Sequence, residues 1–173
     1  LKVNLVRIDS EKLKVSEIKS KLKNISGILI PGGFGKRGTD GKIAAIKFAR
    51  INKIPFLGIC YGMQMAIIEF ARNKLNLKKA TSSEFDKKGL AIIGLMNEWN
   101  KDGKKIKGTD KNLGGTMRLG SYDAKLLKNS MIQKIYGKNL IKERHSHIYE
   151  VNIAFKEKFV INCMNFSCLS PDC

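Results

Sequence analysis

The sequence is poor in acidic residues, aromatic residues and histidine. It has 15 Asp and Glu against 33 Lys and Arg, a formal net charge of +18, 8% aromatic residues and two histidines. Such a basic excess is typical of proteins that bind nucleic acid or acidic membranes. The lysines are scattered along the whole chain, however, and no RNA- or DNA-binding motif accompanies them. We therefore interpret the excess as a solvated, lysine-coated surface and expect no nucleic-acid partner.

The sequence also lacks an apolar run long enough to cross a membrane, and no signal peptide is visible, so we expect no membrane partner. Its four cysteines do not form the pattern of a secreted disulfide scaffold, which predicts a reducing cytoplasm. The last three, Cys163, Cys168 and Cys173, follow a C-x4-C-x4-C spacing. Zinc ligand pairs are closer together and a fourth ligand is missing, so no metal site is predicted.

The order of the predicted elements indicates an α/β fold. Strands are expected over 1–8, 25–30 and 54–59, and helices over 11–23, 40–52 and from residue 61 to about 75, the first capped by Ser10. This alternation implies a parallel sheet with helices on its faces and sites at the carboxyl ends of its strands. The remainder is predicted as a polar loop over 81–85, a strand over 90–96, a flexible segment over 97–112, an extended segment over 113–120, a helix over 130–136 and a strand over 140–151.

One cysteine stands between two glycines at the corner from a predicted strand to a predicted helix, in Gly58-Ile59-Cys60-Tyr61-Gly62. A tight turn there forces an unusual backbone at Cys60, and the glycines let the neighbouring backbone pass closely. The positive end of the following helix favours the reactive thiolate. A lone cysteine is more usually a buried structural residue. The paired glycines and the strand-to-helix corner favour a catalytic nucleophile.

Attack of a thiolate on an amide also requires an oxyanion hole and a base. The backbone N–H groups of Tyr61 and Gly33 are candidates for the oxyanion hole, although Pro31-Gly32-Gly33 alone would be an ordinary turn after a strand. The base has only two candidates, His145 and His147, which alternate on a predicted strand and therefore share one face. They are either a base or histidines with a positioning or surface role.

Several motifs extend this pattern in order along nearly the whole chain. They include Pro-Gly-Gly-Phe-Gly-Lys-Arg-Gly over 31–38, the cysteine corner over 58–62, Ser-Glu-Phe over 83–85 and Gly-Gly-Thr-Met-Arg-Leu-Gly over 114–120. In these motifs the chain resembles the class I glutamine amidotransferase domain of the CTP synthases. The resemblance implies a flavodoxin-like α/β fold with a central, mostly parallel sheet whose C-terminal part is missing. It further implies that 1–173 is one amidotransferase domain, truncated at both ends and without the N-terminal synthetase domain.

The resemblance also implies roles for individual residues. Cys60 would attack the side-chain amide of L-glutamine, giving a glutamyl thioester and ammonia. Glu84 would hold the α-amino group of glutamine, since a carboxylate suits an ammonium partner. The other residues implied to bind glutamine are Gly33, Tyr61, Gly62, Met63 and Gln64.

For the parent enzyme, the resemblance implies a cytoplasmic glutamine-hydrolysing ligase and a homotetramer. Ammonia would pass to a synthetase domain that binds UTP and ATP with Mg and makes CTP. GTP would be the activator, and the segment 114–120 would belong to the region linked to that activation. No cofactor is expected in this part of the chain itself.

The sequence departs from the family in three respects. The family's catalytic His and Glu lie in a Phe-His-Pro-Glu motif that this sequence lacks, so the chain alone is expected to be inactive. Ser146 and Ile148 replace two arginines, the second of which contacts glutamine in the family. Cys163, Cys168 and Cys173 stand where the family tends to have glycine or another small residue, and turn glycines often adopt φ > 0. Two alternatives therefore remain: a non-catalytic binding module or decayed copy with a basic surface, and a Cys-His hydrolase that uses His145 or His147.

Overall fold

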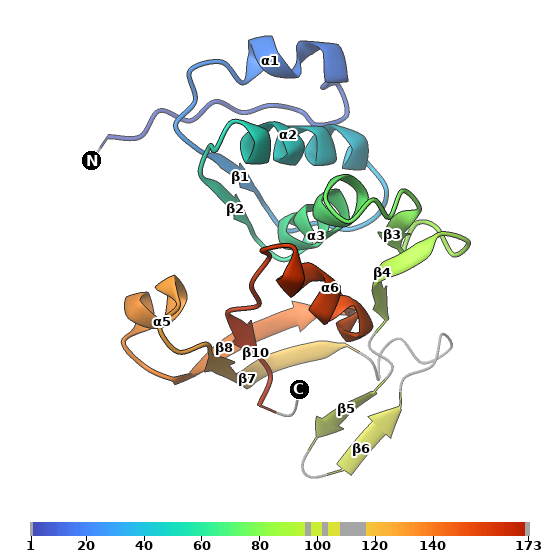
Figure 1. Cartoon of the computed structure of the whole chain (residues 1–173), viewed down its shortest axis with the longest axis vertical. Coiled ribbons are helices and arrows are strands. Elements are labelled where there is room, and N and C mark those ends of the chain that lie inside the picture. The colour runs from blue at the N-terminus through green and yellow to red at the C-terminus, as the bar shows by residue number, and fades with distance from the viewer. Residues whose placement is uncertain (1, 96–97, 102–103, 108–116, 172–173) are drawn as a thin grey trace. The chain divides into compact units, whose positions relative to one another are not determined.

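The computed structural model describes residues 2–95, 98–101, 104–107 and 117–171 (Figure 1). The chain divides into two compact units, Leu1–Ile92 and Ile93–Cys173, and each is described by itself. No helix of the described residues is long and apolar enough to cross a membrane.

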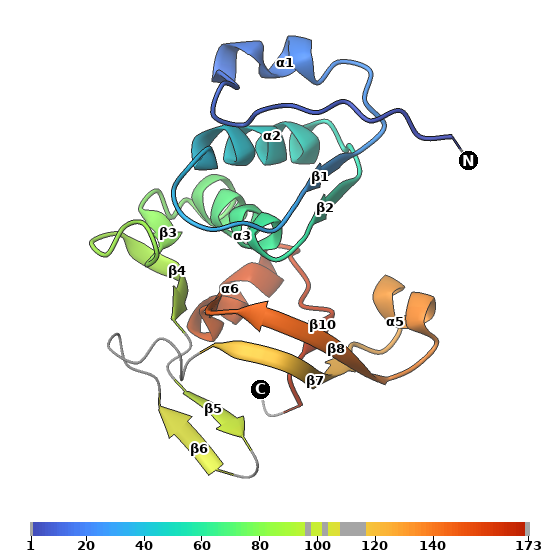
Figure 2. The same cartoon turned by 180° about the vertical axis from the view of Figure 1, so that it is seen from behind.

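The first unit contains a parallel pair of short strands with two helices packed against it (Figures 1 and 2). Strands β1 (Ile28–Ile30) and β2 (Phe56–Gly58) pair with Ile30 opposite Gly58. Helix α2 (Thr39–Ile51) connects them and α3 (Tyr61–Asn73) follows β2. Further along, β3 (Ala80–Ser82) lies beside the start of β4 (Leu90–Leu95), where the N–H of Leu90 donates to the Lys79 carbonyl at 2.8 Å. This β-α-β-α order confirms the predicted α/β class.

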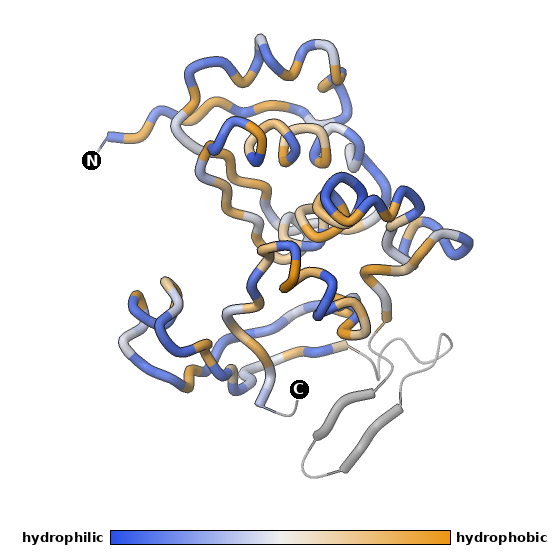
Figure 3. The backbone as a smooth tube through the Cα atoms, viewed as in Figure 1, coloured by the Kyte–Doolittle hydropathy of each residue, from blue (hydrophilic) through white to orange (hydrophobic). Residues whose placement is uncertain are grey.

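Burial follows the helical period in both helices. Helix α2 buries Ile43, Ile46 and Ala49, and α3 buries Met65 and Ile68, with spacings of three residues that place them on one face of each helix. Figure 3 shows the apolar character of β1 and β2 beside the mixed colouring of the helices. The helices therefore form because their apolar faces cover the strands and each other.

The start of the chain differs from the prediction. Residues 2–9 form no strand, and Val3, Leu5 and Val6 are exposed. The predicted helix over 11–23 is reduced to the 3-10 helix η1 (Val15–Glu17) and α1 (Ile18–Lys21).

Ser10 does not cap the shortened helix, since the N-cap of η1 is Lys14. Ser10 instead lies so close to the start of α2 that a Cβ placed on Gly38 or Gly41 would overlap it. This local packing replaces the predicted capping bond.

The second unit is built on antiparallel strands. Strand β7 (Arg118–Leu126) pairs with β8 (Leu140–His147) and with the short β10 (Cys168–Leu169). The last residues of β4, Ile93 to Leu95, pair with β9 (Tyr149–Val151), so the strand predicted over 140–151 is in fact two strands separated at Ile148. Helix α5 (Met131–Tyr136) is capped by the Ser130 hydroxyl, which accepts from the Gln133 N–H at 3.2 Å.

Two further features of this unit bear on the sequence predictions. The segment predicted to be flexible forms a hairpin in its described part, β5 (Glu98–Lys101) with β6 (Lys104–Lys107). The 3-10 helix η2 (Ile153–Phe155) and α6 (Lys156–Ile161) then lead to Cys163, whose φ is 70°. That value confirms a backbone conformation suited to glycine at this position.

Candidate active site

Cys60 has the strained backbone expected of a nucleophile at a tight corner. It lies two residues after the end of β2 and immediately before α3, with φ 51° and ψ −103°. A non-glycine residue with positive φ is uncommon, and such strain costs on the order of 1–3 kcal/mol and gathers at functional sites. Its thiol is partly exposed. The structure therefore places Cys60 at the start of a helix, as the sequence predicts.

The two glycines beside Cys60 are required by close packing. A Cβ on Gly58 would lie 2.5 Å from the carbonyl carbon of Gly62, inside any normal contact distance. A Cβ on Gly62 would overlap the carbonyl oxygen of Ile30 in the neighbouring strand. Both glycines therefore let the corner fold back on itself and against β1.

The Pro-Gly-Gly loop lies beside the same corner. The N–H of Ile59 donates to the Ile30 carbonyl at 2.9 Å, which extends the pairing of β1 and β2 to the corner. A Cβ on Gly32 would lie 3.8 Å from the Cβ of Cys60, and one on Gly33 would lie 3.8 Å from Cδ1 of Tyr61. Backbone from the two predicted oxyanion-hole segments thus meets at the carboxyl ends of the two strands.

Gly35 joins Glu84 to this corner. Its N–H donates to Oε1 of Glu84 at 2.6 Å, and its carbonyl accepts a hydrogen bond from the Tyr61 hydroxyl. The buried position of Tyr61 and the nearby charge of Glu84 raise the pKa of Tyr61 from its ordinary value of 10 to about 12. Glu84 is therefore held beside the same glycine-rich loop that carries Gly33.

The remaining predicted glutamine-binding residues lie on the first turn of α3. Gly62 and Gln64 are buried, whereas Met63 is exposed. The structure thus brings together Cys60, Gly33, Tyr61 and Glu84 through the loop and the corner.

Sequence reasoning did not identify the role of Gly35. The available signal was the second glycine of Gly33-Phe34-Gly35, which has φ 74° and open space where a side chain would stand.

The two histidines lie on β8 in the second unit and share one face, as predicted. Nδ1 of His145 lies 2.8 Å from Nε2 of His147, and Nδ1 of His147 lies 3.7 Å from Oε1 of Glu150. Burial lowers the pKa of both histidines, and the charge of Arg118 lowers them further. Their closest nitrogens therefore interact with each other.

Two predictions concern metal and the activator segment. Among the described residues, no group of three or more His, Cys, Asp or Glu side chains is arranged to hold a metal ion. Of the segment linked by resemblance to GTP activation, residues 114–116 lie outside the described residues, and Arg118 to Gly120 begin β7.

The strained cysteine corner, the glycine loop and the acidic partner define a class of protein. The family profile described as "Glutamine amidotransferase class-I" matches residues 1–169, and the chain belongs to that family. Its curated relatives are more specific. The chain is 84% identical over 172 residues to the CTP synthase of Pelagibacter ubique and 51% identical over 175 residues to that of Zymomonas mobilis. It covers 32% of the length of each, and 99% of the chain is matched in both.

A solved structure resembles the chain across almost all of its length. The Trypanosoma brucei CTPS glutaminase domain with bound acivicin aligns with a TM-score of 0.85 and 36% identity, covering 98% of this chain and 63% of that one. The class I glutamine amidotransferase fold is therefore confirmed. The chain spans about a third of the length of the curated relatives it matches.

Proposed function

We propose that this chain is the glutamine-hydrolysing part of a CTP synthase and that Cys60 is its nucleophile. The observation that carries the proposal is the positive φ of Cys60 at a corner whose glycines cannot accept a side chain. Strain of this kind persists only where the surrounding packing enforces it, and it is typical of active sites. A decayed or purely binding copy would have no need to keep it, so the alternative of a non-catalytic module is less well supported.

The chemistry follows from the groups at the corner. The Cys60 thiolate adds to the side-chain carbonyl carbon of glutamine, and the developing oxyanion accepts hydrogen bonds from the backbone N–H groups of Gly33 and Tyr61. Collapse of the tetrahedral intermediate breaks the C–N bond, and the leaving nitrogen takes up a proton and departs as ammonia. Water then hydrolyses the thioester, giving glutamate and regenerating the thiol.

Glutamine recognition would use the acidic group beside the loop. The carboxylate of Glu84 would accept from the α-ammonium of glutamine, with Gly62, Met63 and Gln64 on the first turn of α3 forming the rest of the pocket. The base is not supplied by the first unit, because both histidines of the chain lie in the second. The resemblance assigns it to a His-Glu pair absent from this sequence, which is why low activity is expected of the chain alone.

The remaining proposals concern the parent enzyme. Ammonia would pass to a synthetase domain that binds UTP, ATP and Mg and forms CTP, with GTP as activator. The parent would act in the cytoplasm as a homotetramer. These proposals rest on the relatives named CTP synthase and on the share of their length that this chain covers.

Covalent labelling tests the nucleophile directly. Acivicin, the compound bound to the trypanosomal glutaminase domain, should add to Cys60 of the 173-residue chain, and glutamine should slow the reaction. Cys163 is exposed and provides an internal control for non-specific alkylation. Peptide mass spectrometry measures the extent of labelling at both cysteines. Equal labelling of the two cysteines, or labelling of Cys60 that glutamine does not slow, would contradict the proposal.

In the full-length protein, Cys60→Ala should lower glutamine-dependent CTP formation by several orders of magnitude and spare ammonia-dependent formation. Cys163→Ala is the matched control and should leave both activities in place. Loss of both activities in Cys60→Ala would contradict a role confined to glutamine hydrolysis.

A further inference from the structure

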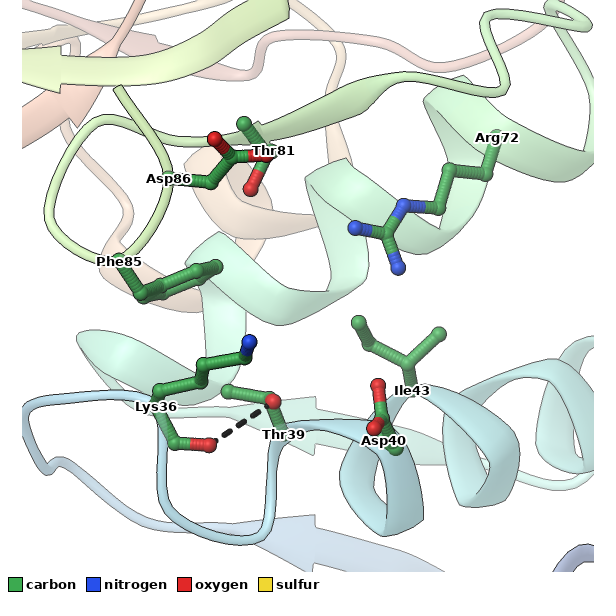
Figure 4. Close-up of a pocket in the computed structure, with 8 residues that line it drawn as sticks. All are labelled: Lys36, Thr39, Asp40, Ile43, Arg72, Thr81, Phe85 and Asp86. Carbon is green, nitrogen blue, oxygen red and sulfur yellow. Dashed lines mark hydrogen bonds between the residues drawn. The ribbon is translucent and has the colours of Figure 1, made fainter. Parts of the chain in front are cut away.

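Two adjoining cavities lie in the first unit. The first, of about 210 Å³, lies between the start of α2, the end of α3 and the segment that follows β3 (Figure 4). The second, of about 360 Å³, shares Arg72, Thr81 and Asp86 with it. Arg72 follows Cys60 by twelve residues on α3, which corresponds to about 18 Å along a helix. Arg72 therefore lies at the other end of α3 from the reactive thiol, whereas the first cavity borders the glycine loop, because Lys36 follows Gly35 and Phe85 follows Glu84.

Arg72 is fixed in place with part of its guanidinium unused. Its Nε donates to the Ala80 carbonyl at 2.7 Å, and within the described ranges its terminal nitrogens form no ion pair or hydrogen bond. In Figure 4 the guanidinium extends from α3 into the space between the two walls of the cavity. A guanidinium held in this way presents two parallel N–H donors, the arrangement that binds oxyanions best.

Asp86 lines both cavities, and one of its two carboxylate oxygens is engaged by the backbone. Oδ1 of Asp86 accepts from the backbone N–H groups of Lys88 at 2.9 Å and Gly89 at 3.2 Å. No ion pair joins Asp86 to Arg72 in the part of the chain that the structure describes. The guanidinium therefore remains available to an anion from outside the chain.

The two cavities differ in chemistry. The second has three lysines on its walls, Lys78, Lys79 and Lys88, which add positive charge next to Arg72. The first has an apolar side formed by Ile43 and Phe85, and Figure 4 shows Phe85 and Lys36 directed toward its interior. Its other lining residues include the buried Thr39 and Thr81 and the exposed Asp40.

We propose that these cavities bind a phosphorylated small molecule. Its phosphate lies at Arg72 with the lysines of the second cavity, where charge-assisted hydrogen bonds hold it. Its organic part lies in the first cavity against Ile43 and Phe85, and Asp40 accepts a hydrogen bond from a donor on that part. The proposal does not depend on the glutaminase function.

The test separates the phosphate from the organic part. The 173-residue chain is titrated with inorganic phosphate and with phenyl phosphate at constant ionic strength, and binding is followed by calorimetry. We expect saturable binding of one molecule per chain, with phenyl phosphate binding more tightly because its ring packs on Phe85. Phe85→Ala should remove that advantage and leave the affinity for inorganic phosphate unchanged.

Two double variants that remove the same charge distinguish binding in the cavities from non-specific electrostatic attraction to a chain of net charge +18. Lys78→Gln with Lys79→Gln should weaken both ligands by about tenfold, as the loss of charge-assisted contacts predicts. Lys47→Gln with Lys53→Gln removes the same charge from exposed lysines that line neither cavity and should change nothing. Circular dichroism checks that all variants are folded. Equal weakening by the two pairs, absence of saturation, or equal affinity for the two ligands would overturn the proposal.

Discussion

The two units of the chain bury their apolar side chains on different elements. In the first, α2 and α3 bury continuous apolar faces, and Met65 and Ile68 have no exposed surface. In the second, the strand β7 alternates between exposed and covered residues, and of its side chains only Ala124 and Leu126 are buried. The comparison explains where the site lies, because a strained backbone such as that of Cys60 persists only where close packing enforces it.

The first unit also contains an ion pair whose carboxylate is buried, and removing it should have the largest effect on stability. Glu69 of α3 is 1% exposed, and its carboxylate accepts from Nε of Arg50 at 2.9 Å and from Nη2 at 2.7 Å. The hydrogen bonds to Glu69 raise the pKa of Arg50. Glu69→Ala would remove the charge-assisted hydrogen bonds to Arg50, which is 30% exposed, at a cost of about 1.5–3 kcal/mol.

Denaturant unfolding measures the decrease in the free energy of unfolding, and hydrogen exchange shows which elements lose protection. Amide protection should drop in α2 and α3 first. Glu17→Ala is the control, since Glu17 forms only an exposed ion pair with Lys21 and its loss should cost less than about 0.5 kcal/mol. A loss in Glu69→Ala no larger than in the control would contradict the importance of this pair.

The Tyr61 hydroxyl connects helix α3 to the glycine loop of the candidate site. Tyr61→Phe keeps the buried ring but removes the hydrogen bond to the Gly35 carbonyl, which should cost about 1 kcal/mol. Because Gly35 also holds Glu84, we expect acivicin labelling of Cys60 to slow, through weaker glutamine-like binding. Tyr122→Phe in the second unit is the matched control. If both variants label Cys60 at the wild-type rate, the hydroxyl does not position the site.

The second unit contains both histidines of the chain, so its stability should depend on pH near the histidine range. Burial lowers the pKa of His145 and of His147 from the ordinary value of 6.5, so the unfolded chain binds protons more readily than the folded one. Stability is therefore complete above pH 6.5 and falls as the pH decreases below it. Glu143, Glu150 and Arg118 also act on this pair.

Thermal unfolding between about pH 7.5 and 5, at constant salt, measures this dependence over a range that spans the histidine pKa. His147→Gln should flatten the curve and hydrogen exchange should place the acid-induced loss in β7 and β8. A curve of unchanged slope in the variant would show that the histidines are not responsible.

The same comparison shows what could be predicted from the sequence. Helices α2 and α3 and the corner at Cys60 follow from apolar periodicity and from glycines that leave no alternative backbone. The strand predicted over 1–8 is wrong for residues 2–8, and the helix predicted over 11–23 is shortened to residues 15–21, because an apolar pattern alone does not determine which segments pair. The roles of Gly35 and of the Arg50–Glu69 pair depend on contacts between distant segments. A charged residue within the buried face of α3 was the only sequence signal for the pair.

The smallest expected effect is at the end of α6 in the second unit. The N–H of Met164 donates to the Phe159 carbonyl and that of Cys163 to the Val160 carbonyl, both at 3.0 Å, which is the double hydrogen bond of a Schellman helix end. Cys163 occupies its left-handed position with φ 70°, where glycine is preferred. Cys163→Gly should relieve a strain of about 1–2 kcal/mol and lose part of that gain to the greater freedom of glycine in the unfolded chain.

The net expectation for Cys163→Gly is a stabilisation of about 0.5–1 kcal/mol, measured by denaturant unfolding. Cys163→Ala is the informative control, because it removes the sulfur but keeps a Cβ at positive φ and should give no such gain. Equal stabilisation by both variants would attribute the effect to loss of the thiol. A gain in the glycine variant alone would show that the backbone of the second unit carries removable strain, whereas the positive φ of Cys60 in the first unit is held by packing at the reactive sulfur.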